Sequence, residues 1–177
     1  MGVRKAWIQV YSGKRYYLLD PKIEDIEIKD IAHALSNICR FSGHTKTFYS
    51  VAQHSVIVGD LMVINNPLYG LLHDASEAYL GDITRPLKSL LPDYRLLEEI
   101  TRNNIYKRFN LKLDLIIKSE VDKYDLIALA TEKRDLMGGG RGWRSLLGIR
   151  PVKEKINPLS PKDSYTLFMS RYNDWKN

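Results

Sequence analysis

Cysteine is nearly absent from this sequence: Cys39 stands alone among 177 residues. A disulfide within the chain requires two cysteines, and a cysteine-rich zinc site requires several, so both are excluded. A protein without disulfides is typical of a reducing compartment, and we therefore expect a cytoplasmic location.

Long apolar runs are absent as well. The first part of the chain, MGVRKAWIQVYSGKRYY, lacks the apolar stretch of a signal peptide. No segment reaches the roughly 20 apolar residues that a membrane-spanning helix needs. We therefore expect no signal peptide and no membrane partner.

Charge of one sign is not concentrated in any segment, although the chain carries a net charge of +6. A basic protein can bind nucleic acid or small polyanionic substrates. No segment alternates aromatic and basic residues as a face that binds single strands would, so nucleic acid is the less favoured partner. Hydrophobic residues make up 44% and charged residues 27% of the chain, as in ordinary globular proteins. A single domain over residues 1–177 is predicted.

The hydrophobic pattern predicts a mainly α fold. The segment before Pro21 alternates weakly around Ser-Gly and predicts a short N-terminal hairpin or extended arm. Ser50 is a suitable helix N-cap, and Gly81 a suitable helix end. Helical periodicity, about six helices in all, is found in residues 25–41, 51–64, 68–80, 92–111, 121–136 and after Pro161.

The segment LLHDASEAYLGDITRPLK, residues 71–88, combines an imidazole, three carboxylates and two cations with an apolar helical pattern. A buried aspartate is costly unless it is paired or bound to a metal. His54 lies on an apolar helix face, and Asp125 has apolar neighbours. Each residue alone is more often a hydrogen-bonded core histidine or an ion-pair partner. Their joint occurrence predicts a metal site formed by His54, His73, Asp74 and Asp125.

Three segments of this sequence resemble the signature of the HD-domain metal-dependent phosphohydrolases. They are VAQHS, LLHDASEAYLGD and VDKYDLIALATE. The Pro86-Leu87-Lys88 turn is similar to that of the YfbR-like 5′-deoxynucleotidase branch. The region DIAHALSNICRFSGHT resembles the small phage and bacterial HD hydrolases that include the cyanophage dATP triphosphohydrolase. The resemblance covers residues 40–136 and implies a single-domain HD-type helical bundle, with a phage origin among the expectations.

The resemblance also implies roles for individual carboxylates. His54, His73, Asp74 and Asp125 would bind one catalytic divalent ion. Glu77 would act near the attacking water or a second metal, and Asp82 would be the general acid or base. Surface charge is the alternative for both. Nitrogen and carboxylate ligands accept several ions, so Mn, Co, Mg, Zn, Fe and Ni all stay open.

Substrate contacts follow from the same resemblance. Arg40 and Lys88 would bind phosphate, with Arg85 as a further cation whose alternative is an exposed turn residue. Phe41 would stack on the nucleobase, a contact that tolerates any base. Gly43 would leave room at the base edge. Trp143 is either a lid over the site or a packed surface residue.

The expected activity is removal of phosphate from a nucleotide through a metal-activated water. One form is a 5′-deoxynucleotidase acting on a deoxynucleoside monophosphate. The other is a triphosphohydrolase acting on a dNTP such as dATP, in which Lys46 would join the phosphate-binding cations. More distant alternatives are a hydrolase of signalling nucleotides and a non-catalytic nucleotide-binding regulatory module. The resemblance further implies a homo-oligomer, a dimer or a hexamer.

Overall fold

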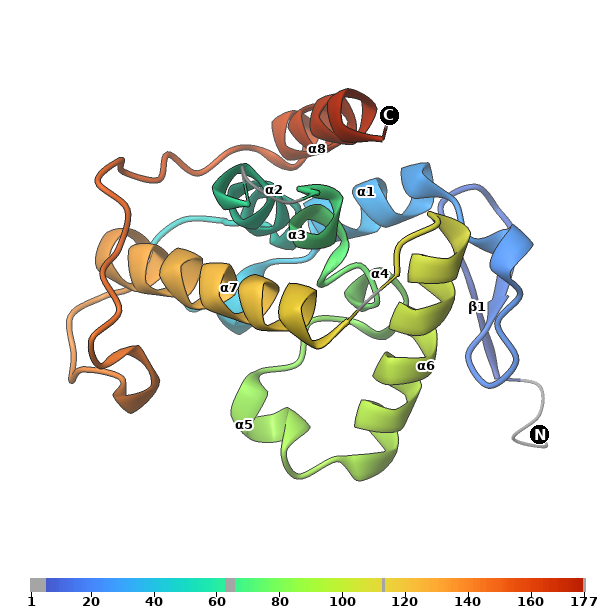
Figure 1. Ribbon diagram of the computed structural model, residues 1–177, viewed down its shortest axis with the longest axis horizontal. Helices are drawn as coiled ribbons and strands as arrows, with labels where there is room; N and C mark the ends of the chain where they lie inside the picture. Colours follow the sequence, from blue (N-terminus) through green and yellow to red (C-terminus); the bar gives the residue numbers. More distant parts are fainter. Residues whose placement is uncertain (1–5, 63–65, 113, 177) are drawn as a thin grey trace.

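The computed structural model describes residues 6–62, 66–112 and 114–176. It confirms the mainly α prediction (Figure 1). The expected helix over 51–64 ends within the described part at Leu61, and residues 63 and 64 lie outside it. The helices in chain order are α1 (Ile28–Asn37), α2 (Val51–Leu61), α3 (Leu68–Leu72), α4 (Glu77–Leu80), α5 (Arg85–Lys88), α6 (Pro92–Arg108), α7 (Leu115–Leu136) and α8 (Pro161–Trp175).

The N-terminal segment is a hairpin. Strands β1 (Trp7–Gln9) and β2 (Arg15–Tyr17) pair antiparallel, with Ile8 opposite Tyr16. Ser12 in the turn donates from its backbone N–H and its hydroxyl to the two carboxylate oxygens of Asp30, at 2.7 and 2.8 Å. Asp30 lies in the first turn of α1, so the hairpin is held against that helix.

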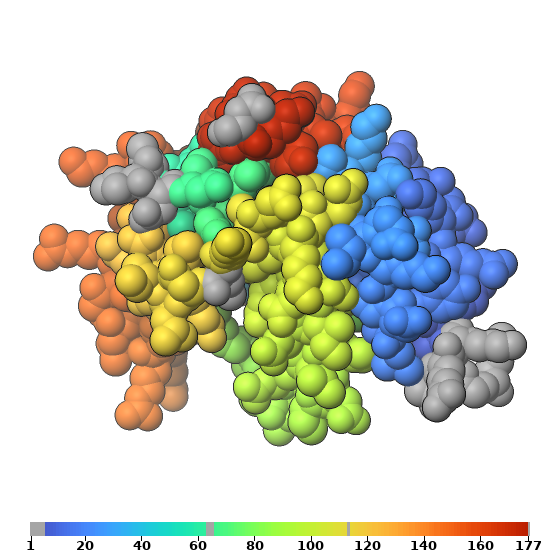
Figure 2. Space-filling model, turned by 45° about the vertical axis from the view of Figure 1, so that its right-hand side comes forward, coloured from blue at the N-terminus to red at the C-terminus, as the bar shows by residue number. Residues whose placement is uncertain are grey.

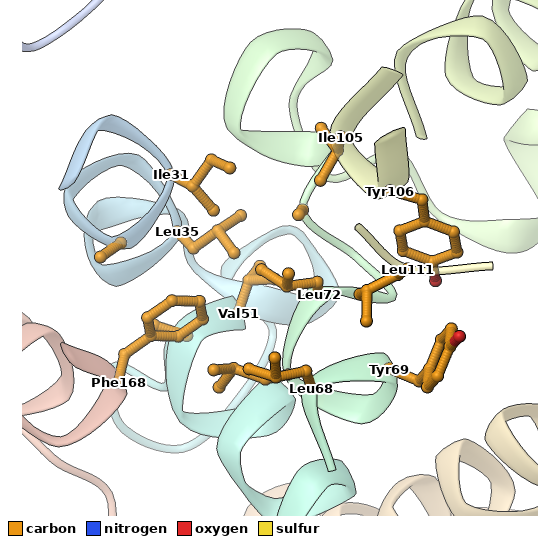
Figure 3. Packing of buried hydrophobic residues seen from close by; sticks show 14 of the residues in the cluster. Ile31, Leu35, Val51, Leu68, Tyr69, Leu72, Ile105, Tyr106, Leu111 and Phe168 are labelled. Carbon is orange, nitrogen blue, oxygen red and sulfur yellow. The ribbon is translucent and has the colours of Figure 1, made fainter. Parts of the chain in front are cut away.

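Helix α2 occupies the centre of the molecule and packs against α1, α3, α7 and α8. Its N-cap is Ser50, as predicted: the hydroxyl accepts from the backbone N–H of Gln53 at 3.1 Å. Apolar side chains from the surrounding helices meet beside it in one core (Figure 3). Figure 2 shows α6 running along one face, between α7 and the N-terminal segment. Among the described residues, no helix is both long enough and apolar enough to cross a bilayer.

The predicted helix over 68–80 is divided into α3 and α4. Between them, backbone N–H groups donate to the carbonyl three residues earlier instead of four, as Ala75 N–H does to Leu72 C=O at 3.1 Å. The carbonyl of Gly70 would normally accept from the residue four positions later. It accepts instead from Nδ1 of His73 at 2.7 Å. Gly81 ends α4 as predicted, with a φ of +82°.

Other boundaries move by a few residues. Helix α7 begins at Leu115 rather than at 121, because Asp114 accepts from the backbone N–H of Ile117 at 2.8 Å and caps it. Helix α6 ends at Arg108 rather than at 111. The hydroxyl of Ser160 accepts from the backbone N–H of Asp163 and caps the start of α8.

Two glycines bring α2 and α3 to backbone contact. A Cβ added to Gly70 would lie 2.7 Å from the backbone nitrogen of Gly59 and 2.8 Å from the backbone carbon of Val58. Backbone atoms within a packed helix cannot move aside as a flexible side chain would. This close approach sets the distance between the helix that carries His54 and the turn that carries His73.

Replacing Gly70 with alanine is therefore expected to lower the free energy of unfolding by about 1–3 kcal/mol, because the added methyl overpacks the contact. Urea unfolding measures it. The matched control is Gly139→Ala, where a Cβ meets nothing within 4 Å, and a change below about 0.5 kcal/mol is expected there. Equal stability of the two variants would contradict this account of the helix contact.

Candidate metal centre and adjoining cavity

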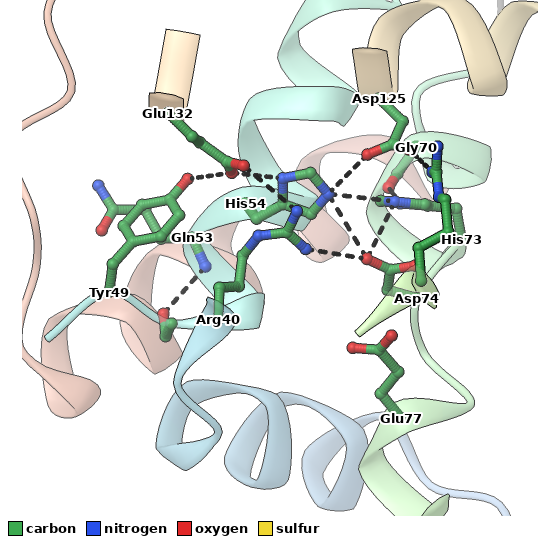
Figure 4. A network of polar contacts seen from close by, with 12 residues as sticks. Arg40, Tyr49, Gln53, His54, Gly70, His73, Asp74, Glu77, Asp125 and Glu132 are labelled. Atoms are coloured by element: carbon green, nitrogen blue, oxygen red, sulfur yellow. Dashed lines mark hydrogen bonds and ion pairs between the residues drawn. The ribbon is translucent and has the colours of Figure 1, made fainter. Parts of the chain in front are cut away.

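Four side chains from three segments converge beside α2 (Figure 4). His54 projects from α2, His73 and Asp74 from the turn after α3, and Asp125 from α7. Nε2 of His54 lies 3.3 Å from Nε2 of His73, 3.5 Å from Oδ2 of Asp74 and 3.3 Å from Oδ1 of Asp125. Nε2 of His73 lies 3.2 Å from Oδ2 of Asp74.

The orientation of both imidazoles is set by hydrogen bonds on the opposite side of each ring. Nδ1 of His54 lies 2.6 Å from Oε1 of Glu132, and Nδ1 of His73 lies 2.7 Å from the carbonyl oxygen of Gly70. Neither oxygen can donate, so both Nδ1 atoms carry the proton. Metal-binding histidines are typically held in this way, with Nε2 left to bind the ion.

The donor set fits a divalent ion. Two Nε2 lone pairs that face each other at 3.3 Å repel unless positive charge lies between them. With bonds of about 2.1 Å, neighbouring ligand atoms lie about 3.0 Å apart in an octahedron and about 3.4 Å apart in a tetrahedron. The observed separations of 3.2–3.5 Å match these edges. His54, His73 and Asp74 thus form a group that could hold a metal ion, as predicted, and Asp125 lies against it.

The electrostatics of the group favour positive charge. Burial lowers the pKa of His73, but the neighbouring Asp74 outweighs it and raises that pKa to about 9. Burial would raise the pKa of Asp74, yet His73 holds it well below its usual range. Burial would also raise the pKa of Asp125, but the hydrogen bond and charge of His54 outweigh it, so that pKa is lowered. The carboxylates therefore draw positive charge into the group, as protons on the imidazoles or as a cation bound between the ligands.

Glu132 is a site residue that sequence reasoning missed. It is fully buried, and its carboxylate accepts from Nδ1 of His54, from Nη2 of Arg40 at 3.2 Å and from the hydroxyl of Tyr49 at 3.0 Å. One signal was present in the sequence. Glu132 follows Asp125 by two helical turns, so both project from the same face of α7.

A cavity of about 710 Å³ opens beside the metal centre. Asp74 and Asp125 form part of its wall. The rings of Phe41 and Trp143 also line it; their centroids lie 6.0 Å apart and their planes are tilted by 48°. Phe41 has a φ of +56°, a left-handed conformation that is costly for a residue other than glycine. Trp143 therefore lines the cavity and is not part of an unrelated surface patch. The backbone at Phe41 is strained where this side chain enters the cavity wall.

Both predicted acid–base residues line this cavity. Glu77 is 3% exposed; one oxygen accepts from Nζ of Lys88 at 3.1 Å, and Oε2 has no hydrogen-bond partner within the described ranges. Burial and the nearby charge of Asp74 raise the pKa of Glu77 well above its usual value. Burial also raises the pKa of Asp82. Two carboxyl groups that can carry a proton thus lie beside the centre.

The three predicted phosphate-binding cations also line the cavity. Arg40 is buried and contacts Glu132 and Asp74, the latter at 3.4 Å. Arg85 donates to Oδ2 of Asp125 at 3.0 Å, although its side chain is 71% exposed. Arg40 and Arg85 therefore contact candidate metal ligands, whereas Lys88 contacts Glu77 and Glu98.

Some singled-out residues lie elsewhere. Gly43 is exposed, has a φ of +78° and is not among the described residues that line the cavity. Lys46 is also exposed and is not among the described residues that line the cavity beside the metal centre. The arrangement therefore does not support the prediction that Gly43 leaves room at the base edge. It also does not support the prediction that Lys46 binds phosphate.

Comparison with known proteins places the chain in a family. No model of a known protein family matches it. The uncharacterized protein YfdR of Escherichia coli (strain K12) is 45% identical over 172 residues, covering 96% of this chain and 95% of YfdR. The uncharacterized protein RCAP_rcc00048 of Rhodobacter capsulatus is 36% identical over 148 residues, covering 77% of this chain and 76% of that protein. The chain therefore belongs to the same family as YfdR.

Proposed function

We propose that this chain is an HD-type metal-dependent phosphohydrolase that removes phosphate from (deoxy)nucleotides. One observation carries the proposal: donor atoms of His54, His73, Asp74 and Asp125 converge at 3.2–3.5 Å, and two of these residues, Asp74 and Asp125, line a cavity that also holds cations and aromatic rings. Phosphate requires the cations, and a base requires a flat apolar surface. The same cavity supplies both.

His54, His73 and Asp74, with Asp125 beside them, would hold the ion. Such an ion, when bound, lowers the pKa of a coordinated water toward neutrality and polarises a phosphoryl oxygen. Glu77 is positioned to carry a proton, because its buried carboxyl faces the cavity and its pKa is raised. Asp82 lies on the same wall and can exchange a proton with water or with the leaving group.

The remaining residues would bind the nucleotide. Arg40 and Lys88 lie beside the candidate ligands, where they would stabilise the charge that develops on phosphoryl oxygens. Phe41 and Trp143 would offer aromatic surface on which the base could stack. Stacking of this kind is tolerant of base identity, so these rings support a nucleotide without selecting one.

Product analysis tests the proposal. Metal-free protein is incubated with each dNMP and each dNTP, with Mn, Co, Mg or Zn added back, and the products are separated by chromatography. Release of nucleoside or of a shorter phosphate ester in a metal-dependent manner is the expected result. No turnover with any metal would overturn the enzymatic proposal and favour a nucleotide-binding module.

Binding of a divalent ion is expected to stabilise the fold, because the ligands come together only in the folded chain. At an ion concentration of 100 times Kd, the free energy of unfolding rises by about 2.7 kcal/mol. Thermal unfolding with Mn²⁺ and then with excess chelator measures the gain and its reversal. The variant His73→Ala is the control and shows no gain. An equal gain in that variant would place the ion elsewhere.

A further inference from the structure

The positive charge of this chain is concentrated in one segment. Residues 133–155 contain seven lysine and arginine side chains and two carboxylates, and so carry five of the six net positive charges of the protein. The rest of the chain is close to neutral. Glycine and apolar residues separate most of these cations, so no long run of charge marks the segment in the sequence. The prediction that charge of one sign is not concentrated in any segment is therefore wrong here.

The fold gathers these cations around the C-terminal end of α7. The chain beyond the glycine-rich loop returns to the last turns of this helix, where the hydroxyl of Thr131 accepts from the backbone N–H of Val152 at 3.1 Å. Nη2 of Arg134 donates to the carbonyl of Glu154 at 2.7 Å. Figure 2 shows side chains of this orange segment protruding from one end of the molecule. We call this surface the basic end; its cations are Lys133, Arg141, Arg144, Arg150, Lys153 and Lys155.

The cations of the basic end are available to a partner. All are exposed except Lys133, which is half-buried. None of them forms an ion pair with another residue in the described part of the chain. Of the two carboxylates in the segment, Asp135 is already paired with Arg134 at 2.7 Å. Several unpaired cations on one surface favour a partner that carries several negative charges.

An aromatic ring joins the basic end to the cavity of about 710 Å³. Trp143 lies between Arg141 and Arg144 in the chain, and it lines that cavity together with Phe41. Nζ of Lys133 lies 5.5 Å from the centroid of the Trp143 ring. Cations interleaved with rings are typical of a face that binds single strands, and the cavity has the volume of a small-molecule site. The reason for disfavouring nucleic acid, the lack of such interleaving, therefore does not apply to the folded chain.

We propose that the basic end binds single-stranded nucleic acid, with one base stacked on Trp143 at the cavity and neighbouring phosphates on the surrounding cations. A strand repeats its phosphate at every nucleotide, which suits cations that are spread over a surface. It also supplies a flat base for the ring, which an acidic protein or an anionic membrane does not. The inference goes beyond the proposed function, because binding a strand requires neither a metal nor turnover.

Fluorescence anisotropy of a labelled oligothymidylate of about 12 nucleotides tests this inference. The full chain is titrated in the presence of chelator at several salt concentrations. The double variant Arg141→Gln, Arg144→Gln is expected to bind about tenfold more weakly near 0.1 M salt. Each phosphate contact on a single strand contributes about 0.7 to the slope of log affinity against log salt. The slope of the double variant should therefore be less steep by about 1.4.

Stacking is tested separately from charge. Trp143→Ala is expected to weaken binding about tenfold and to leave the salt slope unchanged, because a ring contributes no counterion release. The matched control is the double variant Arg95→Gln, Lys107→Gln, which removes two exposed cations of α6 outside the basic end. It changes the net charge by the same amount and should alter neither the affinity nor the slope. Circular dichroism shows whether each variant is folded.

Four outcomes would overturn the inference. They are no binding of the oligonucleotide at low salt, an equal loss in the control pair, equal affinity for a base-free polyphosphate of matched charge, and binding of vesicles that contain phosphatidylserine in place of the oligonucleotide. The polyphosphate is expected to bind at least about tenfold more weakly, because it offers no base to the ring.

The two proposals can fail separately. Strand binding is measured without metal, so absence of turnover with every nucleotide would leave it in place. Metal-dependent turnover of nucleotides without any strand binding would reject only this inference.

Discussion

Replacing Asp74 with asparagine is expected to lower metal-dependent phosphate release about a thousandfold or more. Metal-ion catalysis supplies several kcal/mol of transition-state stabilisation, and each 1.36 kcal/mol is a factor of ten in rate. Oδ2 of Asp74 lies within 3.5 Å of both Nε2 atoms. A neutral amide keeps the shape of the side chain but loses the charge that draws a cation between the imidazoles. Steady-state rates with the best substrate and metal measure the loss.

The control is Asp93→Asn, an exposed aspartate in the first turn of α6. Its rate should stay within a factor of two of the wild-type rate, as is usual for a surface site away from the chemistry. Circular dichroism of both variants separates loss of the centre from loss of fold. A folded Asp74→Asn variant with wild-type rates would remove Asp74 from the proposed chemistry.

Replacing Glu132 with glutamine is expected to lower the free energy of unfolding by about 3 kcal/mol, the lower end of the usual cost of breaking a buried ion pair. Arg40 would lose its fully buried carboxylate partner and keep the partly exposed Asp74 at 3.4 Å. Affinity for the metal should also fall by about 10–100-fold, because Nδ1 of His54 would donate to a neutral amide oxygen instead of a carboxylate, which makes its Nε2 a weaker ligand. Urea unfolding and metal titration give the two values.

Two further variants test the origin of that loss. Glu99→Gln changes an exposed glutamate of α6 and should alter neither quantity. Tyr49→Phe removes one neutral donor to Glu132 and should cost about 1 kcal/mol. If Glu132→Gln reduced stability but left metal affinity unchanged, the affinity of His54 for the metal would not depend on the negative charge of this carboxylate.

Local sequence patterns were sufficient to predict the elements that bring the ligands together. Helical periodicity placed His54 on the buried side of α2, and it is fully buried there. The same reasoning predicted that His73, Asp74 and Asp125 would lie close to His54, as they do. These predictions succeeded because a buried polar side chain on an apolar helix face needs a hydrogen-bond or charge partner, and the sequence offers few such partners.

The parts that could not be predicted depend on contacts between distant segments. The break after Leu72 arises because the His73 side chain takes the carbonyl of Gly70, which no periodicity shows. Glu132 lies near the charged C-terminal end of α7, where the pattern resembles a solvated helix end. Arg102 lies on a helix whose polar residues are mostly exposed. The cavity of about 230 Å³ that it lines is formed by side chains from α5, α6, α7 and the turn after α3.

A ribosome releases the parts of this centre in a fixed order. His54, His73 and Asp74 leave first, whereas Asp125 and Glu132 follow only with α7. At about 5–20 residues per second, roughly 3–10 s of synthesis separate Asp74 from Asp125. During that interval the His54 ring lacks the carboxylate that orients it, so an ion captured by the nascent chain would meet an incomplete and unselective set of ligands. The complete set of candidate ligands therefore exists only after α7 has left the ribosome.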